Sequence, residues 1–138
     1  MMSINSIDYL YSAEKMLVEN KDEITIRNAI SRAYYSGFHG ANSLVTNEFK
    51  QSRDWMDINA GMHMKLIRSL ESFSGCIHGL DKQKARKLAR QLKWLKTKRE
   101  IADYDLNKNL YEVDAQQTIV EAKKLVAESS EILIKKTE

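Results

Sequence analysis

The sequence predicts an all-α protein, folded as a five-helix, up-and-down antiparallel bundle. Apolar residues recur about every 3.6 positions through five segments that are separated by short breaks. The 138 residues include no proline and only five glycines, whereas sheet proteins of this size use both residues in many tight turns. The length favours one domain over residues 1–138, long enough to bury a core of its own.

The composition is that of a soluble globular chain. Hydrophobic residues make up 43% and charged residues 30% of the sequence, which does not suit a disordered protein. The N-terminus has no signal-peptide pattern, and no apolar stretch approaches the ~20 residues needed to cross a bilayer. The single cysteine, Cys76, excludes an internal disulfide framework. We therefore expect an intracellular, cytoplasmic protein that has no part in a membrane.

The helices are predicted from apolar periodicity and from capping residues at their first turns. Asp22 suits the cap of the second helix, and Asp114 with Gln117 resembles a capping box for the last. Residues 47–58 lose the periodicity and are expected to form a connection. The predicted helices span residues 6–20, 22–46, 59–72, 81–104 and 114–134.

The second helix is the element around which we expect the chain to be organised. It carries a broad apolar stripe and, beside it, a seam of hydrogen-bonding groups where a surface helix would have Glu and Lys. Small residues repeat along the same helix and favour the close approach of another helix. The apolar stripe is Ile26, Ile30, Ala33, Tyr34, Gly37, Phe38, Ala41, Leu44 and Val45, and the polar seam is Asn28, Arg32, Tyr35, His39 and Asn42.

The fourth helix concentrates positive charge. Residues 81–100 hold nine Lys and Arg against two acidic residues, a net charge of +7, while the whole chain carries +3. Such a face is typical of nucleic-acid binding, or it is a solvated face or a docking surface for an acidic chain. Arg99 stands at a core position and is expected to pair with Asp103, four residues on. The basic residues that share a face are Lys82, Arg86, Arg90 and Lys93.

Two motifs resemble those of a known family. The run S-R-A-Y-Y-S-G-F-H-G-A over residues 31–41 and the run R-E-I-A-D-Y over 99–104 are similar to HEPN (higher eukaryote and prokaryote nucleotide-binding) domains. The closer resemblance is to the stand-alone prokaryotic subfamily with R-A-Y-Y-x-x-F-H and R-x-x-A-D-Y, in which a histidine is frequent where His63 lies. The resemblance implies a helical bundle, usually homodimeric. Many members are metal-independent endoribonucleases in toxin–antitoxin or defence systems, and others only bind nucleotides or partners.

The family's catalytic signature is an arginine, four to six residues, then a histidine. In the toxin branch it lies late in the chain, where this sequence has Arg99 followed by Tyr104 in place of the histidine. Arg32 and His39 fit the spacing in the early helix. The resemblance then implies His39 as the general base on a ribose 2′-OH and Arg32 as the cation that stabilises the transition state. Tyr35 would orient the imidazole or donate to a phosphate oxygen, Arg99 would assist, and the supporting residues would be Asn28, Asp103 and Tyr104.

Two hypotheses follow. In the first, the protein is a metal-independent endoribonuclease that uses Arg32 and His39. In the second, it is a non-catalytic module that binds a nucleotide, an RNA or a partner such as a nucleotidyltransferase-like antitoxin, and the polar seam is an internal network. No cofactor or metal is expected, since Cys76 and His78 have no second ligand pair at zinc spacing. Trp55 and Trp94 are expected to be packing residues.

Overall fold

The fold is a helical bundle. The computed structural model describes residues 4–137, and within that range it contains helices and no strand. The five longer helices lie close to where the periodicity predicts them, with differences at their ends. The second ends at Asn42 instead of residue 46, and the third begins at Met62 instead of residue 59. The last begins at Glu112, so Asp114 lies inside it and accepts a hydrogen bond from the N–H of Tyr111 instead of acting as the predicted N-cap. Two one-turn helices, α3 and α4, occupy residues 47–58, which the sequence predicted as an irregular connection. The helices are α1 (Ser6–Glu19), α2 (Glu23–Asn42), α3 (Asn47–Lys50), α4 (Arg53–Met56), α5 (Met62–Ser72), α6 (Lys82–Tyr104) and α7 (Glu112–Thr137).

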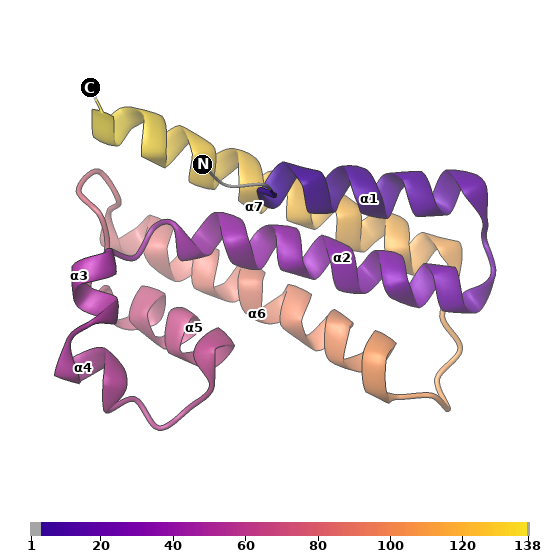
Figure 1. Cartoon of the computed structure of the whole chain (residues 1–138), viewed down its shortest axis with the longest axis horizontal. Coiled ribbons are helices and arrows are strands. Elements are labelled where there is room, and N and C mark those ends of the chain that lie inside the picture. The colour runs from indigo at the N-terminus through magenta and orange to yellow at the C-terminus, as the bar shows by residue number, and fades with distance from the viewer. Residues whose placement is uncertain (1–3, 138) are drawn as a thin grey trace.

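Helix α2 lies at the centre of the bundle. It packs against α1, α6 and α7, and α5 packs mainly against α6. Figure 1 shows α1 and α6 running antiparallel to α2, with α7 returning antiparallel to α6. The short helices α3 and α4 lie beyond the end of α2, next to α5. The prediction that the chain is organised around its second helix is confirmed.

Side-chain caps fix where the main helices begin. Asn5 accepts hydrogen bonds from the backbone N–H groups of Ile7 and Asp8, while Asp8 accepts one from the N–H of Asn5. This reciprocal arrangement is a capping box and satisfies amides that have no partner inside the helix. Asp22 caps α2 and Asp81 caps α6 by a simple N-cap, in which one carboxylate oxygen accepts from the backbone N–H of Thr25 or of Lys84. The predicted cap at Asp22 is confirmed.

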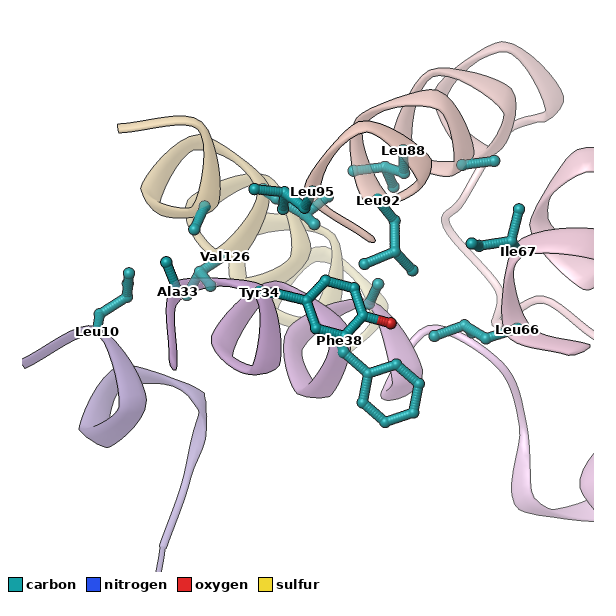
Figure 2. Close-up of a cluster of buried hydrophobic side chains, with 14 of the residues drawn as sticks. Leu10, Ala33, Tyr34, Phe38, Leu66, Ile67, Leu88, Leu92, Leu95 and Val126 are labelled. Carbon is teal, nitrogen blue, oxygen red and sulfur yellow. The ribbon is translucent and has the colours of Figure 1, made fainter. Parts of the chain in front are cut away.

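The apolar stripe of α2 forms the core. All nine of its predicted members are buried, and Figure 2 shows Tyr34 and Phe38 among leucines of α5 and α6. A Cβ atom at Gly37 would lie 2.8 Å from Leu95 Cδ1 and 2.9 Å from Leu125 Cδ2. The close approach predicted for the small residues is therefore confirmed, and their partners are α6 and α7 of the same chain.

Arg27 is the buried residue that the sequence analysis missed. Its side chain is almost enclosed, with 8% of the residue exposed. The guanidinium donates to the backbone carbonyls of Ile101 and Ala102 in the last turn of α6, to those of Asp105 and Lys108 just after it, and to the carboxylate of Glu23. Because the last carbonyls of a helix have no partner inside it, Arg27 ties the start of α2 to the end of α6.

Two loops are joined at the opposite end of the bundle. Val45 and Cys76 form an isolated antiparallel bridge, so the chain after α2 is held against the loop between α5 and α6. Trp55 of α4 is buried, with 4% exposed, as predicted for a packing residue. None of the helices within residues 4–137 has the length and apolar character needed to cross a membrane.

Candidate functional site

Arg99 lies against two tyrosine rings on the side of the bundle formed by α2, α5 and α6, and its Nε is buried without a hydrogen-bond partner among the described residues. Its guanidinium carbon is 5.1 Å from the ring centre of Tyr34 and 5.9 Å from that of Tyr35. One terminal nitrogen lies 3.6 Å from the carboxylate of Asp103, and only 13% of the arginine side chain is exposed. The predicted burial and pairing of Arg99 are confirmed. The aromatic faces add attraction for the cation.

His63 of α5 completes this arrangement. Its Nδ1 is hydrogen-bonded to the Tyr34 hydroxyl, and its ring lies 4.3 Å from that of Phe38 and 6.2 Å from that of Tyr35. Burial lowers the pKa of His63, and the positive charges of Arg99 and Lys96 lower it further. The imidazole is therefore neutral at neutral pH. We call His63, Arg99, Tyr34 and Tyr35 the His63–Arg99 cluster.

The bond between Tyr34 and His63 determines where the imidazole carries its proton. Tyr34 is fully buried, and burial raises its pKa far above the usual value, so the phenol keeps its proton. Its hydroxyl has the imidazole as its one hydrogen-bond partner among the described residues. We therefore assign the hydroxyl as donor and Nδ1 as acceptor, which leaves the ring proton on Nε2. His63 then presents an N–H donor beside a guanidinium.

His39 lies close to the cluster but in a different environment. The residue is exposed, its ring stacks on that of Tyr9 at 5.2 Å, and the edge of Phe38 meets it at 5.2 Å. In the described chain neither of its ring nitrogens forms a hydrogen bond. Contact with these rings removes water from part of the imidazole and lowers its pKa. His39 is thus a neutral imidazole with free nitrogen atoms.

A cleft of about 820 Å³ opens beside His39. It lies between the start of α1, the end of α2, helix α3 and the last turns of α7. Lys50 on its rim donates to the backbone carbonyl of Asn42 at 2.7 Å, and burial lowers the pKa of this lysine. The lining includes His39, Tyr9, Asn42, Asn47, Lys50 and Ser130. The lining also includes the apolar side chains of Val45, Ile77 and Leu133 and the carboxylate of Glu48. The imidazole and the lysine suit an anionic group of a ligand, while the apolar side chains suit a less polar part of it.

Arg32 and His39 do not meet in this cleft. Arg32 is exposed and donates a hydrogen bond of 3.0 Å to the hydroxyl of Ser12 on α1. It is absent from the described residues that line the cleft. Seven residues separate the two side chains, which places them about 10 Å apart along the helix. Tyr35 lies between them on the sequence and is half-buried, with its ring 6.2 Å from that of Tyr9.

The remaining predicted residues are spread along the bundle. Asn28 is exposed at the start of α2, and Tyr104 is 72% exposed at the end of α6. Asp103 belongs with Arg99 and accepts a long hydrogen bond of 3.4 Å from Ser31. The four residues of α6 that were predicted to form its basic face are exposed, and none of these four forms an ion pair with another described residue. They are Lys82, Arg86, Arg90 and Lys93.

His63 is the functional candidate that sequence reasoning left out of the site. The only signal for it was its position within the resemblance to HEPN domains, because periodicity places it between two methionines without a companion. Its partners come from α2 and α6, so only the tertiary structure brings them together. Within the described part of the chain, no three His, Cys, Asp or Glu residues gather as metal ligands do.

Comparison of the chain with protein-family models, with curated proteins and with solved structures gave no match.

Proposed function

We propose that the chain binds RNA and cleaves it as a metal-independent endoribonuclease of the HEPN type. The observation that carries this proposal is the state of His39. It is a neutral, exposed imidazole with both nitrogens free, at the edge of a cleft of about 820 Å³. A buried, hydrogen-bonded histidine would have had no proton-accepting atom to offer. Independence from metal ions rests on the resemblance to HEPN domains.

The chemistry needs a base and fixed positive charge. His39 accepts the proton of a ribose 2′-OH, and the 2′-oxygen then attacks the adjacent phosphorus. The bond from phosphorus to the 5′-oxygen breaks, and that oxygen takes a proton from solvent. The products are a 2′,3′-cyclic phosphate and a 5′-hydroxyl. The ammonium of Lys50, which lines the cleft together with His39, favours the negative charge that develops at the phosphate. Arg99 and His63 are not among the described residues that line the cleft, and in this proposal they assist from the neighbouring His63–Arg99 cluster.

Arg32 has a more distant role in this proposal. Since it lies along the seam and outside the cleft, its exposed guanidinium suits a neighbouring phosphate of the same strand. Tyr35 is placed beside both Arg99 and His63, where its hydroxyl suits a phosphate oxygen. We propose that the protein works as a cytoplasmic homodimer in a toxin or defence system, with a nucleotidyltransferase-like antitoxin as a partner. Sedimentation at tens of micromolar, the range of ordinary dimer affinities, tests the dimer.

A second candidate function is RNA or partner binding without cleavage. It is favoured by the internal pairing of the His63–Arg99 cluster, in which Arg99 contacts Asp103 and His63 bonds to Tyr34. Paired groups of this kind are as typical of structural networks as of active sites. The basic face of α6, in contrast, is exposed and unpaired, so it can contact phosphates whether or not the cluster is catalytic.

The experiment that separates the two candidates is His39→Ala, with His78→Ala as the matched control. His78 is an exposed loop histidine, so its loss is expected to change nothing. Single-stranded RNA is incubated with each variant in the presence and absence of a chelator. We expect His39→Ala to lose cleavage while RNA binding and the melting temperature stay close to wild type, and the chelator to have no effect. A wild-type protein that binds RNA and never cleaves it supports the second candidate.

A further inference from the structure

Trp94 is exposed at the middle of the outer face of α6. Trp94 was predicted to be a packing residue, but 38% of it is accessible, compared with 4% of Trp55. Lys98, one turn later, holds its ammonium 5.0 Å from the centre of the indole ring. Arg90 lies one turn earlier on the same face. An aromatic platform with cations on both sides along the helix is an arrangement that single-stranded nucleic acids recognise.

Trp94 also forms one wall of a groove between α6 and α7. The groove has a volume of about 520 Å³ and is lined by Arg90, Gln91, Trp94, Gln117 and Glu121. Two carboxamides, one carboxylate and one guanidinium therefore surround the indole. The Oε1 atom of Gln91 is buried and has no hydrogen-bond donor among the described residues, so the exposed amide of Gln117 is the carboxamide that a ligand can reach. The groove thus combines a surface for stacking with groups that bind the polar edge of a planar ligand.

We propose that this groove binds an unpaired base of single-stranded RNA. The base stacks on the indole of Trp94, and the exposed amide of Gln117 meets its polar edge. Arg90 and Lys98 lie beside the adjoining phosphates. This inference rests on the proposed RNA binding by α6 and adds a site that holds a base, where the basic face alone would hold only the backbone.

The charges around the groove favour RNA over an apolar helix of a partner protein. The indole is the one large apolar side chain among the five that line the groove, whereas a helix-binding groove is lined mainly by apolar residues. Glu121 is paired with Lys124 at 3.3 Å, so its negative charge is partly balanced. Arg90 also belongs to the basic face with Lys82, Arg86 and Lys93, so the groove continues a surface suited to a phosphate backbone.

The test measures binding of a short, labelled single-stranded RNA by fluorescence anisotropy. The RNA carries 2′-O-methyl groups so that the protein cannot cleave it, and the same strand in a duplex is measured in parallel. The variants are Trp94→Ala, which removes the ring, and Trp94→Phe, which keeps an aromatic face. Tyr11→Ala, at a 67% exposed aromatic residue of α1, is the matched control.

We expect Trp94→Ala to weaken single-strand binding roughly 5- to 150-fold, the range typical of one stacked base. Trp94→Phe should lose only a few-fold by the same reasoning, and the control should bind like wild type. Duplex binding should not change, because paired bases do not reach the indole. The single strand should also quench the tryptophan fluorescence of the unmodified protein, a readout that needs no variant.

The outcomes distinguish this site from the proposed function. If Trp94→Ala binds the single strand like wild type, or if quenching is absent while binding occurs, the groove is not a base site. In that case, charge reversal of Lys82 and Arg86 to Glu would still weaken RNA binding. This would show that the basic face contacts RNA although the groove holds no base. Equal losses for single strand and duplex would also overturn stacking. A wild-type protein that binds neither RNA contradicts the proposed function itself.

Discussion

The hydroxyl of Tyr34 donates a hydrogen bond to Nδ1 of His63, and this bond joins the central helix to α5 inside the bundle. Tyr34 has no exposed surface, so no water competes for its proton. Figure 2 shows its hydroxyl directed toward the side of the core on which Leu66 and Ile67 of α5 lie. The bond keeps the imidazole in one tautomer, and it favours the neutral form because a protonated Nδ1 cannot accept.

Replacement of Tyr34 by phenylalanine should raise the pKa of His63. The change removes the donor that stabilises neutral Nδ1, although burial and the charge of Arg99 continue to lower the pKa. One lost hydrogen bond with its partner left unpaired should reduce the free energy of unfolding by about 1–3 kcal/mol. Titration of the His63 ring protons by NMR measures the first effect, and urea unfolding measures the second. Tyr35→Phe is the control, since the Tyr35 hydroxyl forms no hydrogen bond to another described residue.

Stability should fall as the pH is lowered through the histidine range. The pKa values of His39 and His63 are both lowered in the folded protein, so the unfolded chain binds more protons between the folded and the unfolded values. The contribution of the two neutral histidines to the free energy of unfolding is therefore fully present above about pH 6.5, the unfolded pKa. It decreases as the pH falls toward the folded pKa values. Urea unfolding at about pH 7.5 and pH 5.5 measures the difference. A protein with His39 and His63 both changed to Gln should lose most of this dependence, and an unchanged slope would contradict the assignment.

Arg27 should be among the most important single residues for stability. Its guanidinium donates hydrogen bonds to four backbone carbonyls and one carboxylate where α2 meets the end of α6. We expect Arg27→Met to lower the free energy of unfolding by about 3 kcal/mol or more, because several charge-assisted hydrogen bonds are lost together. Arg53→Met, at an exposed arginine of α4, should stay within about 0.5 kcal/mol of wild type. Equal effects of the two changes would show that Arg27 is not a structural clamp.

Replacement by alanine should have different effects on thermal stability at Gly37 and at Gly40. A Cβ at Gly40 would meet Val126 at 3.5 Å, an ordinary contact, whereas at Gly37 it would meet two buried leucines at under 3.0 Å. Alanine is favoured over glycine in a helix by about 1 kcal/mol, so Gly40→Ala should raise the melting temperature. At Gly37, overpacking costs about 1–3 kcal/mol, which cancels or exceeds that gain. Thermal unfolding of the two variants tests the comparison, and a gain for Gly37→Ala would mean that the leucines repack freely.

The sequence was sufficient to predict the positions of the longer helices and the residues of the core, because both depend on local periodicity. The buried stripe of α2, the cap at Asp22 and the burial of Arg99 beside Asp103 all follow from spacings of three or four residues. The short helices α3 and α4 were missed, since a single turn shows no repeat. Arg27 and His63 were missed for another reason. Their partners lie on other helices, and Arg27 bonds mainly to backbone carbonyls, which no side-chain pattern reveals.

The candidate site was predicted less completely than the fold. The spacing of Arg32 and His39 placed both on one face of α2, and this much holds. Spacing along one helix could not show that α1 covers part of that face. There, the Ser12 hydroxyl accepts a hydrogen bond from Arg32, and the ring of Tyr9 stacks on that of His39. It also could not show that Arg99, His63 and the tyrosines gather from three helices. The exposure of Trp94 likewise depends on how α7 packs beside α6.

Arg99→Met tests whether the His63–Arg99 cluster is held together by its cation. The change removes the positive charge that lies against two tyrosine rings and is paired with Asp103. We therefore expect a loss of about 1–3 kcal/mol in the free energy of unfolding. The pKa of His63 should rise in the same variant, because the positive charge of Arg99 helps to lower it. Asp103→Asn is the matched change: it removes the ion pair but keeps the guanidinium over the rings, so the pKa of His63 should stay low. Arg99→Met with full stability and an unchanged His63 pKa would show that the arginine only faces solvent.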